Sequence, residues 1–121
     1  YFNKALLVVE KASAGHTIVD KLKNDYHYSN MYKYKEYDAR GLAKKKVGFV
    51  TNPKTKPLMI NDFVELFELK QIVINSKDLL SEMKMFQFKD GKMSAIVGYH
   101  DDLVMSFAMA IVGMKSAINY I

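Results

Sequence analysis

The chain has 121 residues, of which half are hydrophobic and 26% are charged, and its formal net charge at pH 7 is +5. This length and composition predict one soluble globular domain over residues 1–121 and exclude a disordered or fibrous chain. The sequence has no cysteine, which excludes disulfides, thiolate catalysis and cysteine metal sites and fits a reducing compartment.

The amino-terminal part predicts a strand followed by a helix. Residues 4–11 place four consecutive large apolar residues between polar ends, which is typical of a strand buried on both faces of a mainly parallel sheet. Residues 13–26 carry apolar side chains at helical spacing, with Ser13 or Thr17 available as the cap. Glu10 would end the strand, at the sheet edge where ligand sites of α/β proteins collect.

A second strand and a ribbon are predicted next. Residues 30–38 alternate aromatic and charged side chains, and residues 44–51 would continue this strand into a ribbon after the break at Gly41. Two prolines and an asparagine predict that residues 51–57 form a loop.

The following segment predicts two helices separated by a short strand. Residues 58–70 place apolar side chains along one helical face. Residues 71–76, with the sequence QIVINS, predict a short strand, and Ser76 is positioned to cap a helix over residues 77–88.

The last part predicts a turn, a strand and a long apolar helix. Asp90 and Gly91 would form the turn within residues 88–98, and the final helix would begin near His100. Its apolar run is shorter than the roughly 20 residues that span a bilayer, so no membrane partner is expected. Alternating strands and helices predict an α/β fold with a largely parallel central part.

Two adjacent carboxylates, Asp101 and Asp102, stand immediately before that apolar run, and we name them the acidic pair. One interpretation is that they cap the helix, because carboxylates stabilise the free amides of a helix start. A single carboxylate suffices for a cap, however, and a second one adds repulsion unless a cation compensates.

Together with Glu10, the acidic pair therefore indicates a site for Mg²⁺ or Mn²⁺, which take oxygen ligands. Such a cluster can hold two ions about 4 Å apart that promote phosphodiester hydrolysis. His100 could donate to a phosphate oxygen or move a proton, or it could simply bond to backbone at the helix end.

A lysine-rich stretch indicates a second candidate function. It could lie along the phosphate backbone of nucleic acid, or it could be a solvated loop. Its members are Lys44, Lys45, Lys46, Lys54 and Lys56.

Several stretches resemble the nuclease domain of the large terminase subunit of tailed bacteriophages. GYHDDLVMSFAMA, residues 98–110, is similar to that family's last acidic motif, and LLVVEKASAGHTIVDKL, residues 6–22, to its strand ending in glutamate. The stretches VGFVTNPKTKPLMINDF, residues 47–63, and IVINSKDLLSEMKMFQF, residues 72–88, resemble the segments between them.

The resemblance implies an RNase H-like fold, a mixed sheet flanked by helices, carrying a two-metal endonuclease. Glu10 would match the family's second acid and the acidic pair its last, with Asp101 as the principal ligand. The substrate would be concatemeric double-stranded DNA, and the partners of the full-length protein would be the small terminase subunit and the portal. The protein would act in the cytoplasm of an infected bacterium.

The family's first catalytic aspartate lies on a strand upstream of the glutamate, and the family also has an ATPase domain. We therefore expect the chain to correspond to the carboxyl-terminal part of a nuclease domain, incomplete at its N-terminus and weakly active or inactive alone. The sheet edge would then be exposed, or it would pair between copies in a homo-oligomer. Two alternatives are another RNase H-like nuclease of the resolvase or transposase type, and a non-catalytic DNA-binding or assembly module of a packaging motor.

Overall fold

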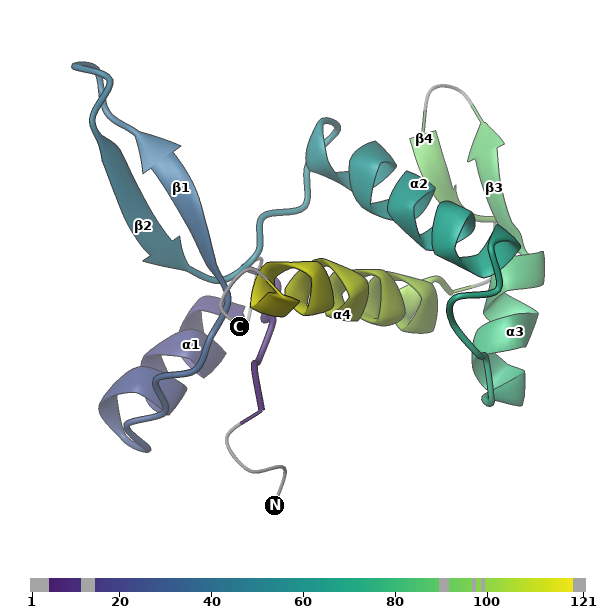
Figure 1. Ribbon diagram of the computed structural model, residues 1–121, viewed down its shortest axis with the longest axis horizontal. Helices are drawn as coiled ribbons and strands as arrows, with labels where there is room; N and C mark the ends of the chain where they lie inside the picture. The colour runs from purple at the N-terminus through teal and green to yellow at the C-terminus, as the bar shows by residue number, and fades with distance from the viewer. Residues whose placement is uncertain (1–4, 12–14, 90–91, 97, 99, 119–121) are drawn as a thin grey trace. The chain divides into compact units, whose positions relative to one another are not determined.

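The computed structural model describes residues 5–11, 15–89, 92–96, 98 and 100–118. Over these ranges the chain is a small α/β protein with four helices and two antiparallel sheets (Figure 1). The helices are α1 (Gly15–Asn24), α2 (Thr55–Glu68), α3 (Lys77–Lys84) and α4 (Asp102–Ile118). The strands are β1 (Lys33–Tyr37), β2 (Ala43–Val47), β3 (Phe86–Lys89) and β4 (Lys92–Ala95).

The chain divides into two compact units. The amino-terminal unit is Tyr1–Thr51 with Ser116–Ile121, and the carboxyl-terminal unit is Asn52–Lys115. The predicted α/β class is confirmed, but the described residues do not form one mixed sheet. β1 pairs with β2 and β3 with β4, each pair antiparallel, and parallel pairing is confined to two isolated bridges.

Both parallel bridges involve the predicted first strand. The Leu7 amide donates to the Asn30 carbonyl at 3.0 Å, and the Leu7 carbonyl accepts from the Tyr32 amide at 2.8 Å, which sets Leu7 beside Met31 in parallel register. In addition, the Tyr28 hydroxyl donates to a backbone carbonyl near the start of the same segment. Residues 5–11 are therefore held along this side by the stretch that leads into β1.

The same strand continues its pairing with residues that lie after β2. The Val9 carbonyl accepts from the Phe49 amide and the Phe49 carbonyl accepts from the Lys11 amide, both at 2.8 Å. The Gly48 amide also donates to the Tyr32 carbonyl at 2.8 Å. One strand thus faces residues 5–11 in two pieces, before β1 and after β2, and the β1–β2 ribbon is inserted between the pieces.

Gly48 is the point at which the chain returns from the ribbon to this strand. Its φ of +115° lies in a region that side chains with a Cβ rarely adopt. A Cβ there would also lie 3.3 Å from both the Val9 carbonyl oxygen and the Lys11 Cβ. Glycine is therefore needed for the close return of the backbone.

The cores of the two units are apolar, and among the described residues no polar or charged residue is buried. In the amino-terminal unit the buried apolar residues are Val19, Met31 and Phe49. In the carboxyl-terminal unit, Phe63 of α2 packs against Phe107 of α4 with ring centroids 5.1 Å apart. α4 contributes buried residues along most of its length, which explains its apolar sequence.

Two predicted elements of the carboxyl-terminal unit are wrong in detail. Residues 71–76 form no strand, because no other described segment pairs with them, and Val73 is 75% exposed. The helix predicted over residues 77–88 ends at Lys84, and the chain then enters β3, which pairs with β4. The predicted turn at Asp90 and Gly91 lies outside the described residues.

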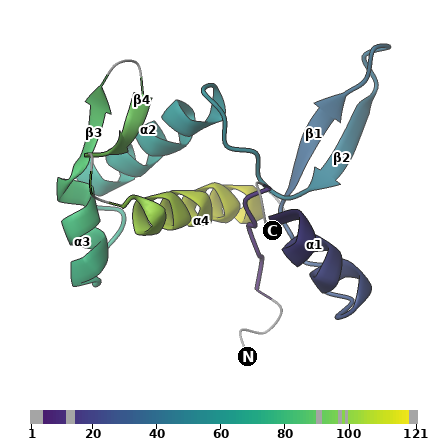
Figure 2. The ribbon, with the colours of Figure 1, turned by 180° about the vertical axis from the view of Figure 1, so that it is seen from behind.

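The remaining elements are close to their predicted positions. Ser76 does cap α3, since its Oγ accepts the amide hydrogen of Leu79 at 3.1 Å. α2 begins at Thr55, inside the predicted loop, and α4 begins at Asp102, two residues after the predicted start. No helix in the described ranges is both long and apolar enough to cross a membrane. Figure 2 shows the same elements from behind.

Candidate functional site

The acidic pair lies at the start of α4. Asp102 is the first residue of the helix and is exposed, while the Asp101 side chain is 27% exposed. The Asp101 backbone carbonyl accepts the Met105 amide at 2.9 Å, which is the first helical hydrogen bond. The sequence prediction of a helix opening on two carboxylates is therefore confirmed.

The cap of this helix comes from another element. Glu82 of α3 accepts hydrogen bonds through Oε1 from the Leu103 amide at 2.9 Å and from the Val104 amide at 3.4 Å. These are amides of the first turn, which have no partner within their own helix. The capping role proposed for the acidic pair is thus filled by Glu82, a residue that the sequence analysis did not single out.

A lysine stands beside Asp101. The Lys56 ammonium lies 3.6 Å from Asp101 Oδ2, with the two side chains 24% and 27% exposed, and 6.0 Å from the centre of the Phe86 ring. Lys56, which is predicted to contact DNA, forms an ion pair with Asp101 in the structure. The pair shows that the position next to Asp101 accommodates a positive charge.

His100 is exposed, immediately before the acidic pair. It lines a hollow of about 520 Å³ in the carboxyl-terminal unit, together with Asp78, Glu82 and Lys84 of α3. His100 and the cap carboxylate of Glu82 therefore border the same concave surface.

Glu10 lies in the amino-terminal unit, in the second of the two isolated bridges made by residues 5–11. It is exposed, and its backbone is bridged to Phe49. α1 starts directly against it, since a Cβ placed on Gly15 would overlap the Glu10 carbonyl oxygen. The predicted helix after Glu10 is confirmed as α1, with glycine required by the close approach. Residues 5–11 form two isolated parallel bridges and no full strand, and the predicted turn lies outside the described residues.

The structure does not assemble the predicted metal ligands into one group. Within the described ranges, no three or more histidine, aspartate or glutamate side chains are grouped so that they could hold a metal ion. Asp101 and Asp102 are adjacent in the carboxyl-terminal unit, and Glu10 belongs to the other unit.

The three consecutive predicted DNA-binding lysines lie on β2 and divide between the two faces of the ribbon. Because neighbouring strand residues point to opposite faces and cross-strand partners share a face, Lys45 lies with its partner Lys35 and with Lys33. We name these three residues the lysine face. Lys44 and Lys46 lie on the opposite face, which we name the paired face.

The paired face carries an acid. Lys44 lies opposite Glu36, and the Lys46 ammonium forms an ion pair with the Glu36 carboxylate. The hydrogen bond and the charge of Lys46 lower the pKa of Glu36, and the same two effects of Glu36 raise the pKa of Lys46. Lys54, the fourth predicted lysine, is exposed just before α2.

The lysine face borders a hollow of about 600 Å³ in the amino-terminal unit. Its lining includes Ser29 and Asn30 as well as all three lysines of that face. None of the described residues that line it is acidic. The sequence analysis missed Lys33 and Lys35, although the predicted β alternation could have placed them together with Lys45.

A search of known protein families gives no family model that matches this sequence.

Proposed function

We propose that this chain belongs to the nuclease domain of a bacteriophage large terminase subunit and has an RNase H-like fold. The complete domain would cut double-stranded DNA by metal-dependent phosphodiester hydrolysis, and this chain would be weakly active or inactive alone. The observation that carries the proposal is the acidic pair at the start of α4. The first-turn amides of this helix are already capped by Glu82. In this proposal the partners are DNA, the small terminase subunit and the portal, in the cytoplasm of an infected bacterium.

The first argument concerns the electrostatic repulsion between the carboxylates of the acidic pair. Two adjacent carboxylates repel each other, and Glu82 places a third carboxylate at the same helix start. Since Glu82 accepts the first-turn amides, helix capping does not explain Asp101 and Asp102. A cation-binding role does explain them, because the single charge of Lys56 does not balance three carboxylates and a divalent ion would offset the remaining repulsion.

The second argument concerns the donor chemistry. Carboxylate oxygens are the ligands that Mg²⁺ and Mn²⁺ prefer, and both ions retain several waters, so few protein ligands are needed. Asp101 would be the principal ligand, Asp102 would support it, and Glu10 would complete the set. When bound, the ions would polarise the scissile phosphate and stabilise charge on its oxygens.

The protein's own residues would orient this chemistry. Glu82 accepts the first-turn amides of α4 and would so hold the helix start that carries Asp101 and Asp102. The Lys56 ammonium lies 3.6 Å from Asp101 Oδ2 and supplies positive charge near the site. His100, which is exposed and adjacent in sequence, would donate a proton to a phosphate oxygen or leaving group.

The test is calorimetric titration of Mn²⁺ into the protein and into an Asp101→Ala variant, together with a plasmid-nicking assay. Asp62→Ala is the matched control, because it removes one carboxylate of the same unit that pairs with Lys115 at 3.3 Å. We expect Mn²⁺ binding in the parent and the control and its loss in Asp101→Ala. Equal Mn²⁺ binding by all three proteins would overturn the proposed ligand.

A second candidate is a non-catalytic DNA-binding or assembly module of a packaging motor, and the lysine face favours it. Its three exposed lysines lie beside a hollow that no described acidic residue lines. Such a surface is suited to a polyanion, whether or not a metal ion binds at the start of α4. Salt-sensitive DNA binding with neither Mn²⁺ binding nor nicking would select this function over the nuclease.

A further inference from the structure

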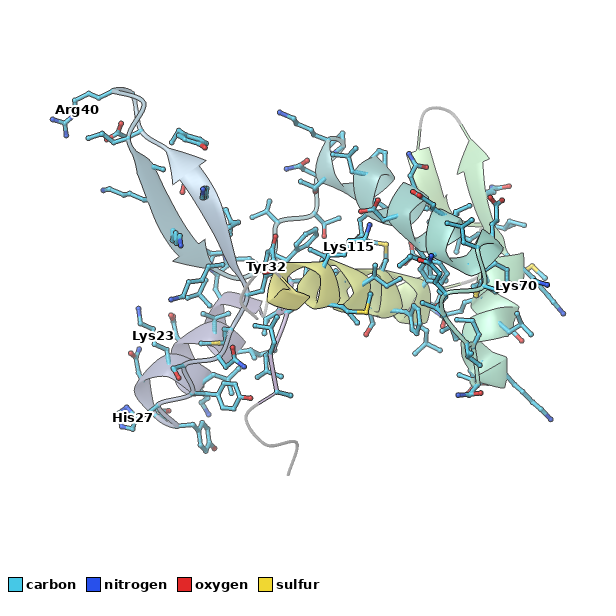
Figure 3. The ribbon with its side chains drawn as sticks, viewed as in Figure 1. Lys23, His27, Tyr32, Arg40, Lys70 and Lys115 are labelled. Carbon is cyan, nitrogen blue, oxygen red and sulfur yellow. The ribbon has the colours of Figure 1, made fainter. Side chains whose placement is uncertain are left out.

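The β1–β2 ribbon is an insertion, and no residue of its two strands is buried. It interrupts the strand that pairs with residues 5–11 between Tyr32 and Gly48, as the hydrogen bonds on both sides of it show. Every residue of β1 and β2 is exposed except Tyr34 and Val47, which are half-buried. In Figure 3, Arg40 lies at the far end of the ribbon and Tyr32 at its base. An element with two solvent-facing sides is available for contacts with another molecule.

The lysine face places like charges against one another. Lys35 and Lys45 are direct cross-strand partners, so their Cβ atoms are about 5 Å apart on one face. Lys33 follows on the same face about 7 Å along the strand. Like charges directly opposite each other destabilise a strand pair, and among the described residues no acid forms an ion pair with any of the three. An anion bound on this face would relieve the repulsion.

The paired face differs in its chemistry. Glu36 neutralises Lys46 there, and Lys11 donates to the Tyr34 hydroxyl at 3.2 Å with its ammonium 5.4 Å from the ring centre. The sequence run Lys44, Lys45 and Lys46 is therefore not one basic patch. Its middle member joins Lys33 and Lys35, while the other two lie beside Glu36.

The hollow beside the lysine face has neutral hydrogen-bonding groups next to the charges. Ser29 and Asn30 line it along with the three lysines. Lysine ammonium groups together with hydroxyl and amide groups are the donors that proteins use to position phosphate oxygens. A two-stranded ribbon also has the dimensions that the major groove of duplex DNA admits.

We propose that the lysine face, with the adjoining hollow, binds the phosphate backbone of duplex DNA, and that the paired face does not. This inference rests on the proposed function for the identity of the nucleic acid, but it does not need a metal ion or cleavage. It predicts contacts that depend on charge and not on base sequence.

The experiment measures binding of a fluorescent duplex of mixed sequence, by anisotropy, over a range of salt concentrations with EDTA present. The test variant is Lys33→Gln, Lys35→Gln, Lys45→Gln. The matched control is Lys21→Gln, Lys23→Gln, Lys44→Gln, which also removes three exposed charges of the amino-terminal unit. Each variant lowers the formal net charge by three, from +5 to +2.

For the parent protein we expect the logarithm of the association constant to fall linearly with the logarithm of salt concentration. Loss of three phosphate contacts should reduce that slope by about 2.7 and weaken binding at least about tenfold at low salt. The slope measured for the control should differ from that of the parent by no more than about 0.9, the value for one phosphate contact. Equal slopes in the two variants, or no duplex binding by the parent, would overturn the inference.

A second measurement needs no variant. Backbone amide shifts of the parent protein, followed by NMR during titration with the duplex, should move along the lysine face and the hollow more than on the paired face. The reverse pattern would also overturn the inference, as would equal shifts with inorganic phosphate alone, which would indicate a site for the free ion. The duplex measurements contain EDTA throughout, so they test DNA binding by the lysine face without a metal ion. Calorimetry with Mn²⁺ tests the metal site separately, and a negative result in one is distinguishable from a negative result in the other.

Discussion

Glu82 and Leu103 are joined by a hydrogen bond of 2.9 Å between a side-chain carboxylate of α3 and a backbone amide of α4. They lie 21 positions apart in the sequence, so the cap of α4 is a tertiary contact. The carboxylate is also favourable at the positive end of the helix dipole. The bond fixes the end of α3 to the start of α4 and leaves the acidic pair without a capping role.

We predict that Glu82→Ala lowers the free energy of unfolding by about 1 kcal/mol, the usual cost of losing a helix cap. Glu82→Gln keeps an oxygen acceptor and should cost less. Urea denaturation followed by circular dichroism measures both. Glu65→Ala, an exposed carboxylate of α2, is the control and should change stability by less than about 0.5 kcal/mol. A Glu82→Ala protein as stable as this control would show that the cap contributes nothing.

Local patterns in the sequence were sufficient for most elements of this fold. The apolar run after the acidic pair predicted α4, and Ser76 predicted the start of α3. The alternation of aromatic and charged residues predicted β1. Each of these signals acts within a few residues, through capping, helical periodicity or strand alternation. The α/β class was predictable for the same reason.

Contacts between distant residues were not predictable in this way. Residues 71–76 have the composition of a strand, but a strand requires a partner, and none of the described segments supplies one. The insertion of the ribbon into the strand facing residues 5–11 depends on hydrogen bonds from Tyr32 and Phe49, which are separated by the whole ribbon.

In the candidate sites, too, only the residues that are neighbours in the sequence were predictable. The acidic pair was visible because its members are adjacent in sequence, whereas Glu82 and Lys56 reach it only through the packing of α2, α3 and α4. The lysine face combines Lys45 with residues ten and more positions earlier, and only the register of β1 with β2 fixes that combination.

The ion pair of the paired face makes a prediction about pH. Lys46 lowers the pKa of Glu36 from its ordinary value of 4.5, so the pair stabilises the ribbon above pH 4.5 and is lost as the pH falls through the lowered pKa. Glu36 raises the pKa of Lys46 above 10.5, so the pair is complete below pH 10.5 and is lost as the pH rises through the raised value.

NMR titration of the Glu36 carboxyl carbon should therefore give a midpoint below 4.5. Lys46→Met should return the midpoint toward 4.5, because Lys46 is the largest cause of the shift. Lys44→Met, which removes a smaller contribution, should move it less. Equal effects of the two substitutions would contradict the pairing of Glu36 with Lys46.

The contact between Lys56 and Asp101 makes a prediction that depends on the proposed metal site. A divalent ion at Asp101 is repelled by a nearby ammonium, and a double and a single charge about 4 Å apart in water interact by about 2 kcal/mol. Lys56→Met should therefore tighten Mn²⁺ binding by up to about thirtyfold in calorimetry. Lys56→Arg keeps the charge and should leave the affinity near the parent value. Weaker binding by Lys56→Met would mean that the lysine positions Asp101 for the ion.

The end of α2 makes the last prediction, at a residue that adopts a left-handed conformation. Lys70 has a φ of +57° and is exposed (Figure 3), and two hydrogen bonds close the helix around it. The Lys70 amide donates to the Phe67 carbonyl at 3.1 Å and the Gln71 amide to the Leu66 carbonyl at 3.0 Å. This is the helix ending that glycine favours.

Lys70→Gly should raise the free energy of unfolding by about 1 kcal/mol, because glycine has no Cβ to strain in the left-handed region. Gln71→Gly is the control one residue later, where φ is not positive and glycine only adds freedom to the unfolded chain. Urea denaturation should therefore show opposite shifts, Lys70→Gly more stable and Gln71→Gly less stable than the parent. Destabilisation of the same size by both would mean that Lys70 is not left-handed in solution.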